Sequence, residues 1–312
     1  MATATVEMGT IRENTGCESA VWRLREYLYA SSPANAVTML RQGSGKGRYI
    51  AGGTDLLLFP PQDCDFVVDI NGAGLGRIAR TPGGGLYLGS TATLQMIAGS
   101  SQVAGYAGGA VARAAHVCGN RPVRTVATLG GNLCSALPSA DMVPVLLALD
   151  AIAHLGDGVT QQSHPLTEFF TGPRVTILGD RLLLGVELPS AAASWRAVSR
   201  KLTRTAEDLA LVHIAVALDL QGRIIRSARI ALGAVAPVPL RATSAEGILT
   251  GLDLSAPGFG ERIPQTVQAA AEAAAQAAAP IDDHRASAAY RRAMIAVLVR
   301  RLIHALVDQE GA

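Results

Sequence analysis

The sequence has 312 residues, of which 49% are hydrophobic and 17% charged, so it can form buried cores and lacks the composition of a disordered chain. Its net charge of +2 is spread along the chain and aromatic residues make up only 4%, which argues against binding of nucleic acid or a membrane surface. The four cysteines are far apart with no C-x-x-C pair, which argues against a zinc or iron–sulfur site in this chain.

The beginning of the chain and its longest apolar run bear on where the protein is located. Residues 1–20 form a polar extension without the basic segment and apolar core of a signal peptide. The run MVPVLLAL lies between Asp141 and Asp150 and is far too short to span a membrane. We therefore expect a cytoplasmic protein with no membrane span and with reduced thiols.

The first predicted elements are a helix and two strands. The segment SPANAVTMLRQ is typical of a short amphipathic helix that Ser32 can cap, with Pro33 in its first turn. The apolar segments GRYIAGG (residues 47–53) and CDFVVDI (residues 64–70) are typical of buried strands. Helix, strand, glycine loop and strand in quick succession favour an α+β unit.

The middle of the chain mixes loops, strands and helices. The glycines of NGAGLGRIAR (residues 71–80) do not fit G-x-G-x-x-G and no long helix follows, so we predict an ordinary loop rather than a Rossmann fingerprint. Residues 83–98 predict a turn, a short strand and a helix that begins near residues 91–93. Residues 108–118 are rich in alanine and predict another helix.

The second half predicts a run of strands followed by helices. Strands are expected within residues 175–189, 195–203, 209–220 and 222–237, with a hairpin-like turn at Gln221-Gly222. Helices are expected within residues 241–251, 266–279 and 287–309. The small, proline-punctuated stretch PSAAAS (residues 189–194) is the best candidate for a boundary, which predicts domains at residues 21–190 and 191–312.

Two segments share one design, in which apolar residues run into Gly-Gly, a small polar residue and leucine: IAGGTDL (residues 50–56) and TLGGNL (residues 128–133). Successive glycines can adopt conformations in which main-chain N–H groups converge on an anion, and Thr54, Thr128 and Asn132 would add side-chain donors. A tight turn explains either segment alone, but the pair favours two loops that meet around the two phosphates of a dinucleotide. The P-loop lysine is absent, which argues against nucleoside-triphosphate hydrolysis.

These segments, in their order along the chain, resemble a known family. AGGTDLL followed by TVATLGGNLCSALPSADMVPVLLALDA is similar to the FAD-binding medium subunit of the molybdenum hydroxylases, the xanthine dehydrogenase and carbon monoxide dehydrogenase family. The likeness continues in KLTRTAEDLALVHIAVAL and DDHRASAAYRRAMIAVLVRRLI and covers roughly residues 22–308. It implies a PCMH-type FAD-binding domain of two α+β subdomains, followed by a three-stranded antiparallel sheet with a helical bundle.

The resemblance also implies roles for individual positions. Around the FAD diphosphate, the first loop would contribute Ile50, Ala51, Gly52, Gly53, Thr54 and Asp55, and the second Thr128, Leu129, Gly130, Gly131 and Asn132. Asp141 would bind ribityl or adenosine hydroxyls, Leu183 would pack on the isoalloxazine, and Lys201 would stabilise the anionic reduced ring at its pyrimidine edge. From the residues alone, a helix-capping aspartate, a core leucine and a solvated lysine stay open as alternatives. Cys118 stands where some members place an aromatic residue, which puts that contact in doubt.

The implied function is electron transfer by non-covalently bound FAD. A large partner subunit with the molybdenum cofactor would oxidise the substrate, and a small [2Fe–2S] subunit would pass electrons to the FAD for an external acceptor, in a dimer of heterotrimers. No catalytic side chain and no metal ligand are expected in this chain, since its histidines are scattered. The alternatives are a self-sufficient PCMH-type flavin oxidoreductase, which would need acid–base residues after residue 190, and a flavin-free scaffold.

Overall fold

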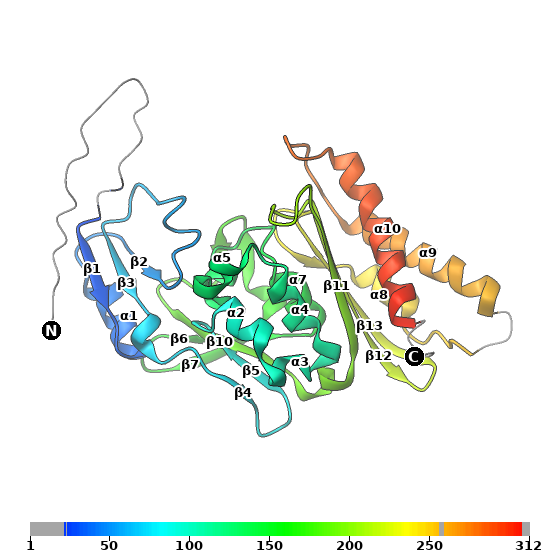
Figure 1. Cartoon of the computed structure of the whole chain (residues 1–312), viewed down its shortest axis with the longest axis horizontal. Coiled ribbons are helices and arrows are strands. Elements are labelled where there is room, and N and C mark those ends of the chain that lie inside the picture. The colour runs from blue at the N-terminus through cyan, green and yellow to red at the C-terminus, as the bar shows by residue number, and fades with distance from the viewer. Residues whose placement is uncertain (1–21, 23, 256–258, 308–312) are drawn as a thin grey trace.

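The computed structural model describes residue 22 and residues 24–255 and 259–307, so the extension predicted for residues 1–20 lies outside the described residues. The chain forms three lobes in a row, from the N-terminal lobe at one end to the C-terminal helices at the other (Figure 1). The first two lobes mix helices and strands, and the third is an antiparallel sheet covered by helices. This architecture confirms the predicted α+β class.

The N-terminal lobe is a small parallel sheet with one helix. Its strands are β1 (Glu26–Tyr29), β2 (Gly47–Ile50) and β3 (Phe66–Asp69), in the order β1–β3–β2, and its helix is α1 (Pro33–Gln42). The predicted helix start is confirmed, because the Ser32 hydroxyl accepts a hydrogen bond from the Asn35 N–H and Pro33 opens the first turn. The edge strand β1 was not predicted. The end of β2 carries the chain into the first glycine segment.

The middle lobe is a five-stranded antiparallel sheet packed against short helices. The strands, in spatial order, are β4 (Ile78–Arg80), β5 (Leu86–Gly89), β10 (Leu182–Leu188), β6 (Ile152–Gly156) and β7 (Gln161–Pro165). The helices are α2 (Leu94–Gly99), α3 (Ser101–Ala104), α4 (Ala110–His116), α5 (Arg121–Val126), α6 (Leu129–Cys134) and α7 (Val143–Ala148), and β8 (Phe170–Gly172) pairs with β9 (Val175–Thr176). Neither β6 nor β7 was predicted, although Asp157-Gly158 between them is a hairpin signal.

Short 3-10 helices fill the connections at Asn71–Ala73, Ala107–Gly109, Leu166–Glu168 and Ser190–Ser194. The first of them belongs to the glycine-rich stretch of residues 71–80, which was predicted to be an ordinary loop. The strand β4 at the end of this stretch was not predicted. The last of them lies in the stretch proposed as a domain boundary and joins β10 to the third lobe.

The C-terminal lobe is a sheet buried on both faces. It contains β11 (Arg196–Leu202), β12 (Val212–Gln221), β13 (Ile224–Gly233) and the short β14 (Leu240–Arg241), with α8 (Thr243–Leu249), α9 (Phe259–Ala277) and α10 (Ala288–Val307). In β12, Ile214 and Val216 pack under these helices, while Ala215 and Ala217 belong to the core of the middle lobe. The three long strands are those predicted, and β14 adds a fourth at the edge. No helix in the described ranges is both long and apolar enough to cross a membrane.

Candidate functional site

The first glycine segment, which follows β2, runs directly against the chain that leads into the second. A Cβ atom at Gly52 would lie 2.0 Å from the carbonyl oxygen of Val126 and 3.0 Å from the Cα atom of Ala127, so only glycine permits this approach. Gly53 has a φ of +68°, in the left-handed region that favours glycine. The first glycine therefore lets the two segments touch, and the second turns the chain.

The first segment offers unused backbone donors. The N–H groups of residues 52–55 donate no hydrogen bond to any described residue. Carbonyl oxygens stabilise the turn instead. The Gly53 carbonyl accepts from the Leu57 N–H and the Asp55 carbonyl accepts from the Phe59 N–H, both at 3.0 Å. Consecutive free N–H groups around a left-handed glycine form a concavity that binds anions. The carboxylate of Asp55 points to another partner, since it lies 3.0 Å from Nη1 of Arg174.

The second glycine segment differs from the predicted nest of free donors. It forms the first turn of α6, and the Thr128 hydroxyl caps that turn by accepting from the Gly131 N–H at 3.1 Å. The N–H groups of Leu129, Gly130 and Asn132 also have backbone acceptors, so the prediction that this loop converges its N–H groups on an anion is wrong. Neither of its glycines has a positive φ.

The two glycines of the second segment have different roles: one allows close packing and the other leaves space beside the chain. A Cβ atom at Gly130 would lie 2.8 Å from the Cβ atom of Ser90, so this position packs tightly on the end of β5. At Gly131 a Cβ atom would meet only the Thr128 hydroxyl oxygen, at 3.0 Å, and the residue is otherwise exposed. Gly131 is therefore the member of the pair that faces a space a ligand could occupy.

A hydrogen bond connects the second segment to Met142, the residue after Asp141. The Asn132 side-chain oxygen accepts from the Met142 N–H at 3.1 Å. Next to it, Asp141 and Lys201 of β11 form an ion pair whose side chains are only 8% and 6% exposed. The Lys201 Nζ atom donates to Oδ2 of Asp141 at 3.1 Å and lies 3.0 Å from Oδ1 without hydrogen-bond geometry. The sequence predicted both residues for the site but not their pairing, and the solvated-lysine alternative is wrong.

Sequence analysis missed two polar residues here, Ser90 and His213. The Ser90 hydroxyl and both ring nitrogens of His213 are buried without a hydrogen-bond partner among the described residues, and Lys201 uses one of its three donors on Asp141. Burial lowers the pKa of His213 to about 4. Buried polar groups are normally hydrogen-bonded, so these unpaired atoms need partners that the described residues do not supply here. His213 could have been identified only from the strand register, which places it opposite Lys201.

Leu183 occupies the core rather than the surface of this region. Its side chain is 2% exposed and belongs to the apolar core of the middle lobe. The neighbouring Leu184 packs with the N-terminal lobe instead, and its carbonyl accepts from the Ser90 N–H at 3.0 Å. Of these two leucines, the one beside Ser90 and the second glycine segment is Leu184.

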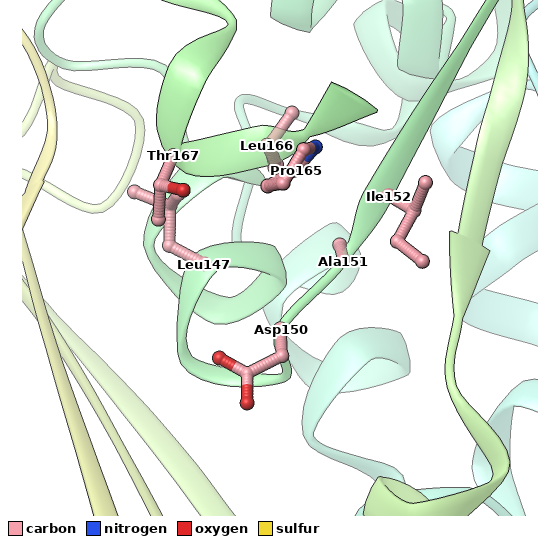
Figure 2. A pocket seen from close by; sticks show the side chains of 7 residues that line it. All are labelled: Leu147, Asp150, Ala151, Ile152, Pro165, Leu166 and Thr167. Carbon is pink, nitrogen blue, oxygen red and sulfur yellow. The ribbon is translucent and has the colours of Figure 1, made fainter. Parts of the chain in front are cut away.

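A separate hollow lies at the end of α7 and contains none of the predicted site residues. Figure 2 shows the side chains that line it, which are Leu147, Asp150, Ala151, Ile152, Pro165, Leu166 and Thr167. The Asp150 carboxylate at its edge is paired with Arg241 at 2.6 Å and with Arg229 at 2.9 Å. Both arginines come from the C-terminal lobe, so Asp150 joins two lobes here.

Comparison with known proteins finds matches over both halves of the chain. A family model described as the FAD binding domain in molybdopterin dehydrogenase matches residues 22–191, and one described as the CO dehydrogenase flavoprotein C-terminal domain matches residues 197–306.

Individual relatives match over almost their whole length. The glyceraldehyde dehydrogenase medium chain of Sulfolobus acidocaldarius is 29% identical over 88% of this chain and 95% of its own. The xanthine dehydrogenase FAD-binding subunit of Escherichia coli O157:H7 is 28% identical over 91% of this chain and 97% of its own. In a solved structure of carbon monoxide dehydrogenase from Hydrogenophaga pseudoflava, lacking the Mo-pyranopterin moiety, one chain matches with a TM-score of 0.83 and 29% identity, covering 91% of this chain and 97% of that one.

Proposed function

The chain belongs to the family of FAD-binding domains in molybdopterin dehydrogenases, with the PCMH-type fold expected from its sequence, and from this premise we propose how it works. Its relatives are FAD-binding medium subunits of molybdenum hydroxylases. In our proposal, this chain takes electrons from a small [2Fe–2S] subunit and delivers them to an external acceptor, while a large subunit with the molybdenum cofactor oxidises the substrate. FAD, when bound, supplies the redox chemistry.

The observation that carries the proposed site is the contact between Gly52 and Val126. It brings the N–H groups of residues 52–55, which have no acceptor in the described part of the chain, beside the second glycine segment. These groups would bind the diphosphate, and the open side of Gly131 would leave room for it. Thr128 and Asn132 would hold the second segment in place rather than supply converging N–H groups. The predicted diphosphate set, residues 50–55 and 128–132, is retained with these changed roles.

The other end of the site would receive the flavin ring. Asp141 would bind ribityl or adenosine hydroxyls, and Lys201 has two unused donors for the pyrimidine edge. A cation there stabilises negative charge that develops on the ring. Leu183 would support the isoalloxazine from the core, with Leu184 nearer to it. We also propose the division into a FAD domain at residues 21–190 and a second domain at residues 191–312.

The iron–sulfur subunit is proposed to dock on the apolar turn after the first glycine segment. Leu57, Leu58 and Phe59 are consecutive and are 59%, 72% and 66% exposed, which is unusual for large apolar side chains next to a polar site. An exposed apolar turn of this kind fits a protein partner, and it adjoins the proposed FAD diphosphate. Leu58→Asp should therefore abolish co-purification with the small subunit and leave FAD content unchanged. The control Val159→Asp alters another exposed residue, 92% exposed in the turn between β6 and β7, and should retain the partner.

The proposed role is tested by expressing the chain alone and with the genes beside its own. Under anaerobic conditions, organic substrates of the complex should bleach the flavin of the complex and leave that of the lone chain oxidised. The described part of the C-terminal lobe has an apolar core between its sheet and its helices. Rapid bleaching of the lone chain by an organic substrate other than a nicotinamide would favour the self-sufficient flavin oxidoreductase instead.

A further inference from the structure

His213 is a buried histidine whose ring makes no hydrogen bond within the described residues. Its residue exposure is 0%, and neither ring nitrogen has a hydrogen-bond partner among the described residues. A buried polar group left unpaired costs the free energy of its desolvation, which a purely structural residue would avoid. The ring of His213 therefore needs a partner that the described residues do not supply.

The charged groups around His213 come from the proposed flavin site. Its Nδ1 atom lies 3.9 Å from Oδ1 of Asp141, and the strand register places it opposite Lys201 on β11. On β13 its neighbour is Gly233, against which Pro144 of α7 packs, so these elements add no titratable group. Cys118 also lies beside Asp141, and burial holds its pKa far above the ordinary value, so the thiol stays protonated.

Asp141, Lys201 and His213 together carry no net charge as they stand, and Arg124 adds a cation beside Cys118, to whose carbonyl it donates at 3.3 Å. Asp141 is compensated by Lys201, and His213 is neutral near pH 7 because burial lowers its pKa to about 4. If a negative charge developed on the other side of Lys201, the single positive charge of its ammonium group would interact with two anions. Asp141 would then carry a partly uncompensated charge in a buried place, which is strongly unfavourable. Since the lysine is already charged and the thiol already protonated, the groups able to accept a proton are the Asp141 carboxylate and the His213 imidazole. Only protonation of the imidazole leaves the ion pair of Asp141 with Lys201 intact.

Resting on the proposed function, we infer that His213 takes up one proton when the bound flavin is reduced by two electrons. The electrons come from the iron–sulfur partner and the proton from solvent. An N–H bond forms on the imidazole, so that both ring nitrogens are protonated and Nδ1–H faces Asp141. The charge added beside Lys201 is thereby balanced within the chain, and the driving force for electron transfer becomes more strongly dependent on pH.

The experiment measures the midpoint potential of the FAD-loaded chain against pH, with redox dyes, in the wild type and in His213→Gln. Glutamine keeps a donor and an acceptor but does not titrate. The wild type should take up one more proton per two electrons than the variant, so its reduction equilibrium should change tenfold more for each pH unit. His154→Gln is the matched control, because His154 is also buried but pairs with Glu187 on the sheet of the middle lobe, and it should follow the wild type.

Parallel pH dependences in the wild type and His213→Gln would overturn the inference. If the variant holds no FAD, the proton count of the wild type alone tests the inference. A flavin beside a cation takes up one proton per two electrons near pH 7, whereas the inference requires a total of two protons for the wild-type chain. Uptake of only one proton contradicts it. A wild-type chain that binds no FAD contradicts the proposed function and this inference with it, whereas FAD binding with an unchanged proton count contradicts the inference alone.

Discussion

The two ends of the proposed site consist of different chemical groups, backbone at one end and side chains at the other. The glycine end consists of backbone groups. Gly52 touches Val126, and the N–H groups of residues 52–55 donate to none of the described residues. The other end is made of side chains, with Asp141 and Lys201 paired and buried under the C-terminal sheet. A change at the glycine end should mainly remove room or donors for the ligand. A change at the buried end also leaves a charge without its partner, so it should affect the fold as well.

The two glycine segments have similar sequences but different conformations. They share Gly-Gly followed by a small polar residue, yet one is a turn with a left-handed glycine and the other is the first turn of a capped helix. Three of the four glycines lack a positive φ, and two of those three are required by close approach to Val126 or Ser90. The pattern predicted that the segments meet but not the conformation of the second.

The largest effect is expected from Lys201→Met. The substitution leaves Asp141 buried without a counter-charge, and breaking a buried pair in this way costs about 3–5 kcal/mol of unfolding free energy. Denaturant unfolding of the apo chain measures it. The double variant with Asp141→Asn should regain most of the loss, because no charge is then left unpaired. Equal stability of Lys201→Met and wild type would show that the buried end is not electrostatically coupled.

A comparable effect is expected from pH through His213. Its folded pKa of about 4 lies below the ordinary 6.5, so between these values the unfolded chain binds a proton that the folded chain does not. Stability from this group is thus fully present above pH 6.5 and is lost as the pH falls toward 4, by roughly 3 kcal/mol. The unfolding free energy of the wild type relative to His213→Gln should therefore decrease by that amount as the pH is lowered from 6.5 to 4. A difference independent of pH would contradict the assignment.

At the glycine end, Gly52→Val should cost less than the lysine substitution. The added side chain collides with the Val126 backbone, and overpacking of this kind typically costs about 1–3 kcal/mol. Separation of the two segments should also eliminate FAD binding. Gly83→Val is the control, because a Cβ atom there has no neighbour within 4 Å, and it should change neither stability nor binding. A Gly52→Val chain with full FAD occupancy would break the claim that the segments must touch.

The smallest effect on the fold is expected from Gly131→Val. A side chain there meets only the Thr128 hydroxyl, so the unfolding free energy should change by less than about 1 kcal/mol. FAD affinity should nevertheless fall at least 100-fold if the diphosphate occupies this space. Titration of the apo variant with FAD, followed by flavin fluorescence, measures the affinity. Wild-type affinity would remove the second segment from the diphosphate site.

Local signals in the sequence were sufficient for much of the fold. Ser32 and Pro33 predicted the start of α1, and Gln221-Gly222 predicted the turn between the two longest strands. The short strands β1, β6 and β7 were missed, since a few residues carry little periodicity of their own. The pairing of Asp141 with Lys201, and the placement of His213 beside them, depend on strand register and on contacts between lobes, which no local pattern encodes.

The most direct test of the account is the FAD content of the purified chain. Expressed alone, it should contain one FAD for each polypeptide, with the absorption bands of an oxidised flavin. Acid precipitation should release all of that flavin into the supernatant, since neither glycine segment contains a histidine or cysteine to form a covalent link. A colourless chain that takes up no FAD on titration, or flavin that stays in the acid pellet, would contradict the account.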